Sequence, residues 1–293
     1  MTTIKEQYSR YPYLNYTMPD DENAPHSIKL QEPFLTKKEI NHYIKKDIND
    51  ILSVGFGGGA EVIKLALEFP DARITAIEIS KVSCAILKKR LKKYNIDNVD
   101  IQLKSLYKVK GSYDFITCSG VLHHLQNPDK GLNKLKSVLK DDGGILLMLY
   151  GKVGRTAVYQ MQELMREVNS PGNKDFPEQI ERFKEIFKKL PRTNWLKRSE
   201  MLIADYKVND AGIVDEFLNV QDEAYTITDF HNFVNKVGFK VLEYSEEFRK
   251  KYYHDIGIKL DKSISEVDKQ YINELFFGDI TKHTAYIIKD GNI

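Results

Sequence analysis

The sequence predicts an α/β protein in which a doubly wound, mostly parallel sheet of seven strands is interrupted by a helical insertion. Three observations lead to this prediction. Short apolar segments alternate with amphipathic helical patterns over residues 48–150, and a glycine cluster at residues 55–59 follows the first of them. Helical patterns alone fill residues 151–226, and two further apolar segments come later. Strands that alternate with helices at this spacing form parallel sheets.

The first elements are expected to form an N-terminal arm or lid over residues 1–47. Residues 1–35 contain prolines at positions 12, 19, 25 and 33 and several aromatic side chains, which predicts an irregular conformation. A short helix is predicted at residues 40–48, just before the regular part of the chain.

Residues 48–150 are expected to hold five strands with helices between them. Helical spacing of apolar residues predicts helices at 61–69, after Ser80, and around Leu132, and Ser80 is expected to cap the second of these helices. Residues 141–144 (Asp-Asp-Gly-Gly) predict a turn before the fifth strand. The predicted strands are residues 51–54, 73–77, 99–103, 113–118 and 145–149.

The remaining chain is expected to form two parts. Residues 151–226 predict a helical insertion on the substrate side, with breaks at Pro171-Gly172 and at Pro191. Residues 227–293 are expected to complete the sheet. This segment has a helix that ends at Gly238 and strands at residues 239–244 and 284–288.

Composition limits the classes of function. The formal net charge of the 293 residues is only +2, which argues against a protein that binds nucleic acid mainly through its phosphates. Cys84 and Cys118 both lie in apolar stretches, so two buried thiols are expected and a cysteine-rich zinc site is excluded. No apolar run suits a signal peptide or a membrane span, so a cytoplasmic protein with no membrane partner is expected. The sequence has no signal for the oligomeric state.

Two features predict a nucleotide-type cofactor. Gly55, Phe56, Gly57 and Gly59 lie between a strand and a helix, where glycines allow a tight turn and a close approach of a ligand to the backbone. Glu78 ends the second strand, where a carboxylate can accept hydrogen bonds from ribose hydroxyls. The alternatives are a purely structural turn and a solvated carboxylate at a helix start. These features fit NAD and S-adenosylmethionine equally.

The fourth strand and the residues that follow it favour one of the two cofactors. Residues 115–125 (Phe-Ile-Thr-Cys-Ser-Gly-Val-Leu-His-His-Leu), Asn127-Pro128 and the Gly143-Gly144 turn resemble the class I S-adenosylmethionine-dependent methyltransferases. The resemblance covers roughly residues 48–150. It implies a Rossmann-like fold, S-adenosylmethionine as cofactor and S-adenosylhomocysteine as product. It also implies further cofactor-binding residues, namely Ile79, Ser105, Leu106, Ser119, Gly120 and, in the arm, Tyr11.

Looser matches and two departures qualify the resemblance. Tyr11-Pro12-Tyr13, residues 222–226 and residues 282–286 resemble one bacterial branch of these methyltransferases. The family often has an acid two residues before the first glycine, but Ser53 stands there. It also often has an acid after the third strand, where this chain has Lys104-Ser105-Leu106, so Ser105 or a backbone carbonyl is expected to make that contact.

Methyl transfer needs alignment of the reactants, and it needs a general base only when the acceptor arrives protonated. His123 and His124 are the candidate bases, and structural or lid roles for both are the alternative. Two adjacent histidines alone make a poor metal site, so no metal is predicted. Tyr8 is expected to cover the cofactor or stack on a substrate. The candidate substrate residues are Tyr13, Tyr150, Tyr225 and His283.

The predicted function is S-adenosylmethionine-dependent methylation of a small molecule or a protein side chain. One alternative is a tRNA or DNA methyltransferase, for which the basic run at residues 88–93 would be the contact rather than a solvated helix face. The motif Asn-Pro-Pro-Tyr, common where amino groups of DNA or RNA are methylated, is absent after the fourth strand, which makes that alternative weaker. A second alternative is a non-catalytic cofactor-binding protein.

Overall fold

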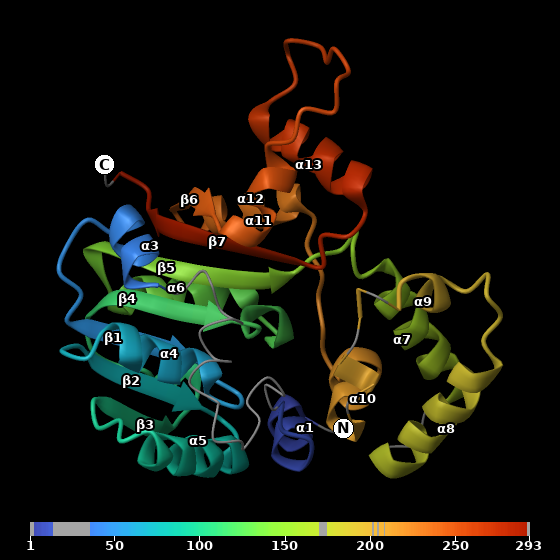
Figure 1. The fold of residues 1–293 in the computed structure, drawn as a ribbon, viewed down its shortest axis with the longest axis horizontal. Coiled ribbons are helices and arrows are strands. Elements are labelled where there is room, and N and C mark those ends of the chain that lie inside the picture. The colour runs from blue at the N-terminus through green and yellow to red at the C-terminus, as the bar shows by residue number, and fades with distance from the viewer. Residues whose placement is uncertain are drawn as a thin grey trace.

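The computed structural model describes residues 3–13, 36–169, 175–200, 202–203, 205–207 and 209–291. Its centre is one seven-stranded sheet with helices on both faces (Figure 1). The strands are β1 (Asp50–Val54), β2 (Arg73–Glu78), β3 (Val99–Leu103), β4 (Tyr113–Ser119), β5 (Leu139–Tyr150), β6 (Phe239–Tyr244) and β7 (Lys282–Lys289).

The strand order is β3-β2-β1-β4-β5-β7-β6. The first five strands pair in parallel, and β7 runs antiparallel to both β5 and β6. The chain therefore winds outward from β1 in both directions. This confirms the predicted doubly wound, mostly parallel sheet.

The helices before the insertion are α1 (Ile4–Arg10), α3 (Lys37–Tyr43), α4 (Ala60–Glu68), α5 (Lys81–Lys93) and α6 (Pro128–Val138). The insertion holds α7 (Thr156–Val168), α8 (Phe176–Lys189), α9 (Trp195–Arg198) and α10 (Asp210–Phe217). After it come α11 (Ile227–Lys236), α12 (Glu246–Tyr252) and α13 (Glu266–Phe277). Three 3-10 turns complete the list: η1 (Leu106–Lys108), η2 (Leu122–His124) and η3 (Asp205–Lys207).

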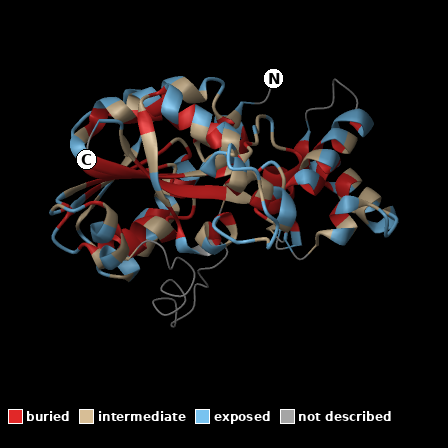
Figure 2. Cartoon of the chain, turned by 90° about the horizontal axis from the view of Figure 1, so that it is seen from above, coloured by how far each residue is buried: buried red, intermediate tan, exposed pale blue. Residues whose placement is uncertain are grey.

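Two apolar cores lie on the two faces of the sheet, because successive side chains of a strand point to opposite faces. Leu52 packs on one face with residues of α6, α11 and α12. Ile51 packs on the other face with residues of α3, α4 and α5. The sheet between these layers is buried along most of its length (Figure 2).

The insertion has its own apolar cluster, in which Phe183 of α8 stacks on Phe217 of α10 and both lie against Tyr206. Helices α7 to α10 lie beyond the carboxyl ends of the parallel strands (Figure 1). In open α/β sheets ligands bind at that edge, so the insertion faces the ligand side of the sheet.

Local chemistry sets several element boundaries. The Ser80 hydroxyl accepts a hydrogen bond from the backbone N–H of Ser83, which confirms the predicted cap of α5. Gly238 follows α11 with a φ of 78°, in the left-handed region that favours glycine. Thr3 and Glu6 form a capping box at the start of α1.

Three predictions about elements were wrong in detail. The arm is not irregular throughout, since residues 4–10 form α1. The predicted helix at 40–48 is α3 at Lys37–Tyr43, because the Thr36 side chain caps it and starts it earlier. Prolines 19, 25 and 33 and the Pro171-Gly172 break lie outside the described residues.

The predicted turn at residues 141–144 falls in an irregular part of β5: Tyr113 pairs with Leu139 and Phe115 with Gly144, so residues 140–143 bulge out of the pairing. Gly143 and Gly144 permit close packing there. A Cβ on Gly143 would meet the carbonyl oxygen of Asp114 at 2.6 Å, and one on Gly144 would meet Ile44 Cδ1 at 2.1 Å. Close approach of a neighbouring strand and of the segment after α3 therefore explains the two glycines.

Candidate active site

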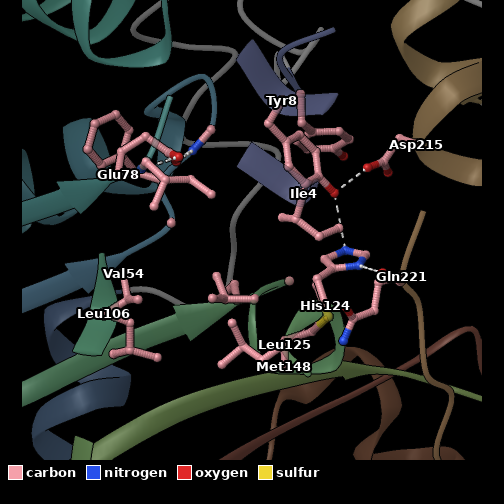
Figure 3. Close-up of a pocket in the computed structure, with 18 of the residues that line it drawn as sticks. Ile4, Tyr8, Val54, Glu78, Leu106, His124, Leu125, Met148, Asp215 and Gln221 are labelled. Atoms are coloured by element: carbon pink, nitrogen blue, oxygen red, sulfur yellow. Dashed lines mark hydrogen bonds between the residues drawn. The ribbon is translucent and has the colours of Figure 1, made fainter. Parts of the chain in front are cut away.

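One cavity of about 1170 Å³ opens at the carboxyl edge of the sheet. Its walls come from the loops after β1, β2, β3 and β4, from the end of β5, from α1 and from the insertion. Figure 3 shows Glu78 on the side of the glycine loop, and Tyr8, His124 and Asp215 grouped together on the side of the insertion.

The glycine loop forms one wall. Gly55 and Gly57 have φ values of 67° and 51°, which side chains of L residues rarely adopt. A Cβ on Gly55 would lie 2.3 Å from Val121 Cγ2, and one on Gly57 would lie 2.9 Å from the carbonyl oxygen of Tyr13. The arm therefore packs directly on the loop that follows β1.

The Glu78 carboxylate lies at the end of β2 and is 7% exposed. Its oxygens accept hydrogen bonds from the backbone N–H groups of Gly57 (3.1 Å), Ile79 (2.7 Å) and Ser80 (3.0 Å). Burial raises the pKa of Glu78, while these three backbone donors act in the opposite direction. The carboxylate is thus held in place by backbone and still lines the cavity.

Glu61 is a site residue that sequence reasoning missed. It lies in the first turn of α4 and lines the cavity. Its carboxylate accepts hydrogen bonds from the hydroxyls of Ser53 (3.2 Å) and Ser119 (2.8 Å). Burial raises its pKa. Ser53 occupies the place where the family often has an acid, so Glu61 supplies a carboxylate beside that position. Its position two residues after Gly59, in the first turn of the helix, was the available signal.

The opposite wall holds a hydrogen-bonded group. The Tyr8 hydroxyl of α1 donates to Asp215 Oδ1 of α10 (2.7 Å) and lies 3.2 Å from His124 Nε2 of η2. The Tyr150 hydroxyl, at the end of β5, donates to Asp215 Oδ2 (3.4 Å). Four separate elements therefore meet around one carboxylate.

Two further carboxylates line the same part of the cavity. Asp205 accepts a hydrogen bond from the Tyr13 hydroxyl (3.3 Å), and burial raises its pKa. Burial raises the pKa of Glu216 to about 8, and the negative charges of Asp205 and Asp215 add to that rise. Burial is the main cause of both shifts, and the positive charge of Arg155 acts against both.

Arg155 is the buried cation of this wall. Its guanidinium carbon lies 3.7 Å from the centre of the Tyr150 ring, and the residue is 7% exposed. Among the described residues its Nε and Nη2 atoms have no hydrogen-bond partner. The guanidinium is therefore held by the face of the Tyr150 ring and by the nearby carboxylates of Asp222 and Glu216.

Most predicted site residues line the cavity. His124 does so among the candidate bases, and Tyr13 and Tyr150 do so among the candidate substrate residues. The predicted cofactor residues that line it are Gly55, Phe56, Gly57, Glu78, Ile79, Ser105, Leu106, Ser119 and Gly120.

Five predicted site residues lie elsewhere. Gly59 starts α4 and packs on Leu87, and the Tyr11 ring packs on Phe176 of the insertion. His123 is fully buried and stacks on Tyr150 at 4.0 Å, and burial lowers its pKa. The other two, Tyr225 and His283, are held together behind the cavity wall.

His283 is a satisfied core histidine. Its Nε2–H donates to the carbonyl of Tyr225 (2.7 Å), so its Nδ1 accepts from the Tyr252 hydroxyl (2.5 Å). Burial lowers its pKa to about 4. Tyr225 in turn pairs with the end of β5, where its N–H donates to the carbonyl of Tyr150. Both residues connect β7 to the segment after the insertion.

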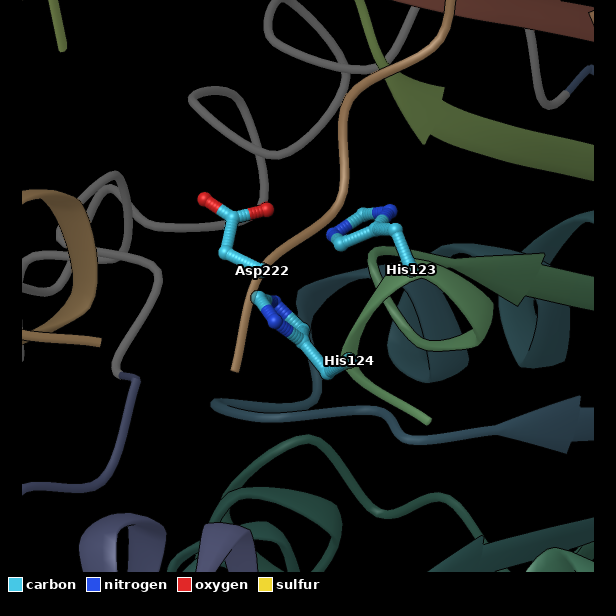
Figure 4. Close-up of side chains that lie close together, drawn as sticks. All are labelled: His123, His124 and Asp222. Carbon is cyan, nitrogen blue, oxygen red and sulfur yellow. The ribbon is translucent and has the colours of Figure 1, made fainter. Parts of the chain in front are cut away.

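His123, His124 and Asp222 lie close together (Figure 4), and of the three only His124 lines the cavity. One ligand-type atom of each lies within 4.8 Å of the others. However, both ring nitrogens of His124 already face hydrogen-bond partners, and the charge of Arg155 acts on His123. A buried guanidinium disfavours a second cation nearby. We therefore assign no metal to this cluster.

Comparison with known proteins supports the class. Residues 52–145 match a protein family described as a methyltransferase domain. An uncharacterised protein of Synechococcus is 33% identical over 68% of this chain and 49% of its own length. Malonyl-[acyl-carrier protein] O-methyltransferase of Halalkalibacterium halodurans is 22% identical over 71% of this chain and 73% of its own length.

A solved structure, PKMT2 from Rickettsia typhi in complex with AdoHcy, has the same fold, with a TM-score of 0.65 and 19% sequence identity. The match covers 87% of this chain and 52% of that one. This chain thus spans about half the length of the Synechococcus relative and of PKMT2.

The fold, the glycine loop with Glu78 and the family match together define the class. Residues 52–145 lie in a Rossmann-like sheet and match the methyltransferase-domain family. None of the helices in the described part of the chain has the length and apolar character that crossing a membrane requires.

Proposed function

We propose that this protein is an S-adenosylmethionine-dependent methyltransferase and that its methyl acceptor is an amine of a small molecule or a protein side chain. The observation that carries the proposal is the composition of the cavity at the carboxyl edge of the sheet. One side offers the glycine loop and Glu78, and the other offers three carboxylates among tyrosines.

The residues of the first side fit the cofactor. The left-handed glycine loop leaves backbone exposed to a ligand, and Glu78 is a buried acceptor for ribose hydroxyls. Glu61, held by Ser53 and Ser119, is the acceptor suited to an ammonium group. Ser105 and Leu106 line the remaining part of this side. When bound, the cofactor supplies a methyl group on a sulfonium, and the chain supplies alignment.

The residues of the second side favour a cationic acceptor. Three carboxylates, Asp205, Asp215 and Glu216, line this side beside the cations Arg155 and Lys282, and an ammonium group can donate hydrogen bonds to a carboxylate there. The face of Tyr13 adds to the attraction, because aromatic rings bind cations, whereas the faces of the Tyr150 ring are taken by His123 and Arg155. The insertion at residues 151–226 supplies the carboxylates, so we assign the acceptor side to it.

The same wall disfavours nucleic acid. Phosphate groups would approach Asp205, Asp215 and Glu216 against repulsion, and the net charge of +2 gives little long-range attraction. A tRNA or DNA methyltransferase is therefore the weaker candidate. The resemblance of the Tyr11-Pro12-Tyr13 arm to one bacterial branch stays a prediction, and Tyr13 lines the cavity.

Calorimetry with S-adenosylmethionine, S-adenosylhomocysteine and NAD tests the cofactor. We expect micromolar binding of the first two and none of NAD. Glu78→Ala should weaken binding at least about tenfold, because a buried acceptor for two hydroxyls is lost. Absence of binding to a folded sample would overturn the proposal.

The acceptor can be tested by incubating the protein with labelled S-adenosylmethionine. The other component is either a cell extract or a separate pool of amines, carboxylates or nucleic acids. We expect label in N-methylated products. Asp215→Asn should reduce the labelling while leaving cofactor binding within about threefold of the wild type. Label confined to RNA or DNA, or to esters, would contradict an amine acceptor.

A further inference from the structure

Tyr8 of α1 joins two groups that can each take a proton. Its hydroxyl oxygen lies 2.7 Å from Asp215 Oδ1 and 3.2 Å from His124 Nε2 (Figure 3). Asn219 Nδ2 donates a third hydrogen bond to the same oxygen (3.4 Å). All three partners belong to parts of the chain that are more than one hundred residues from Tyr8 in sequence.

The hydrogen atoms of this group can be counted. His124 Nδ1 lies 2.8 Å from the carbonyl oxygen of Gln221, and a carbonyl only accepts, so Nδ1 carries a proton. In a neutral ring Nε2 then has a lone pair. Tyr8 has one hydroxyl proton, which at 2.7 Å goes to Asp215. Nε2 and the Tyr8 oxygen then face each other without a proton between them.

The group is therefore one proton short when His124 is neutral and Asp215 is ionised. One added proton completes it, because Nε2–H donates to Tyr8 and Tyr8 donates to Asp215. The positive charge of the ring is then connected through one hydroxyl to a carboxylate. Hydrogen bonding of this kind favours the charged form of a histidine.

Tyr8 itself is a bridge and not a base. Burial raises its pKa well above the usual value, and the negative charge of Asp215 raises it further. The hydroxyl therefore keeps its proton at neutral pH. Its hydroxyl links His124 to Asp215 through hydrogen bonds, and both of these residues line the cavity.

His124 and its neighbour in sequence have different surroundings. His123 lies in the same turn, and burial lowers its pKa, so it stays neutral. The other titratable or charged groups around His124 are Tyr8 on α1, Asp215 on α10, Tyr150 on β5, Asp222 after α10, and Arg155 beside Tyr150. Two of these are carboxylates and one is a guanidinium.

We propose that His124 and Asp215, joined by Tyr8 of the N-terminal helix, form a proton-accepting pair that takes the proton an acceptor ammonium must lose before it is methylated. The inference rests on the proposed function of the cavity. An N–H bond of the acceptor breaks, its electron pair stays on nitrogen, and the proton goes to the hydroxyl oxygen of Tyr8, which lines the cavity. Tyr8 passes its own proton to His124 Nε2, whose lone pair faces that oxygen, and keeps the new proton in the hydrogen bond to Asp215. The nitrogen lone pair then forms the new N–C bond, and the electrons of the broken C–S bond stay on sulfur. His124 is the final proton acceptor, and Tyr8 relays the proton to it.

The pair can be tested without a substrate, by titrating His124 with ¹⁵N-histidine NMR on the full chain. Tyr8→Phe removes the bridging oxygen, so the protonation equilibrium of His124 should change about tenfold toward the neutral ring. Asp215→Asn should shift it in the same direction. Tyr271→Phe, which removes a hydroxyl from α13, is the matched control and should leave it unchanged.

Kinetics with an amine acceptor provides the second readout. Tyr8→Phe should lower kcat about a hundredfold and shift the pH profile, while calorimetry shows unchanged binding of S-adenosylhomocysteine. If Tyr8→Phe fails to fold, Asp215→Asn gives both readouts. An unchanged pKa of His124 in a folded variant overturns the pair. Loss of cofactor binding in the wild type would instead refute the proposed function, and it leaves the NMR result intact.

Discussion

At the scale of single residues, buried carboxylates of this protein differ in how their charge is compensated. Asp114 contacts the ammonium groups of Lys46 (2.8 Å) and Lys140 (2.9 Å) and accepts from two backbone N–H groups. Glu61 is held by two hydroxyls, and Glu216 has neighbours of like charge. The first arrangement stabilises the fold, whereas the other two leave charge available to a ligand.

Glu61 gives a prediction about the cofactor. Glu61→Gln should weaken S-adenosylmethionine and S-adenosylhomocysteine by about tenfold, because a carboxylate beside the ammonium group of the cofactor is lost. Calorimetry with 5′-methylthioadenosine, which lacks the amino-acid part, is the control and should give the wild-type affinity. Equal loss for all three compounds would mean that Glu61 only supports the loop.

Asp114 gives a prediction about stability in acid. Burial alone would raise its pKa, but Lys46, Lys140 and the backbone donors hold it well below the usual value. A lowered pKa stabilises the fold above the unfolded-state pKa of about 4, and this stability is lost as the pH falls below it. Asp114→Asn should lower the free energy of unfolding at pH 7 by about 1.5 to 3 kcal/mol. Urea denaturation from pH 7 to pH 3 should then show a weaker acid dependence in the variant.

At the scale of elements, helix ends are connected to distant parts of the chain by side chains. Glu274 of α13 accepts a hydrogen bond from the backbone N–H of Ile227, at the start of α11 (2.7 Å). It is completely buried, and its other oxygen lies 3.5 Å from His283 Nε2. One carboxylate therefore joins α11, α13 and β7.

The raised pKa of Glu274 predicts that the folded state loses stability as the pH rises. Burial raises its pKa to about 7, above the unfolded value of about 4.3. The folded state therefore binds the proton more tightly, and stability falls as the pH increases from about 4 to 7. Glu274→Gln should reduce this fall by about 2 kcal/mol, measured by urea denaturation at pH 5 and pH 8. An identical slope in the variant would show that other groups cause it.

At the scale of the whole molecule, the N-terminal helix connects the sheet to the insertion. The Ser80 hydroxyl at the start of α5 donates to the carbonyl of Tyr8 (3.0 Å). The buried Gln7 side chain accepts from the backbone N–H of Val220 (3.0 Å), just after α10. The cavity lies between these two attachments, so α1 forms part of its enclosure.

This arrangement predicts a response to the cofactor that spans the molecule. Binding of S-adenosylhomocysteine should slow hydrogen exchange in α1 and α10 as well as in the glycine loop, because all three line one cavity. Hydrogen exchange with mass spectrometry checks this, with Glu78→Ala as the control that removes the effect. Protection limited to the glycine loop would show that the cofactor does not couple the two sides.

The sequence alone determined the sheet, its strands and the nucleotide-type end of the site. These rest on local signals, since strand and helix periods, the glycine loop and Glu78 can each be read within about 30 residues. For the same reason Tyr11 and Gly59 were misplaced relative to the cavity, because sequence shows that a residue is near a motif and not where its side chain points.

Tertiary structure alone decided which distant residues meet. Glu61 reaches the position beside Ser53 because α4 packs on the sheet, and Tyr8 reaches Asp215 across more than two hundred residues. His283 and Tyr225 are hydrogen-bonded to each other in the core, so neither side chain lines the cavity. Such contacts depend on how the insertion and the arm pack on the sheet, and packing between distant segments leaves no periodic trace in the sequence.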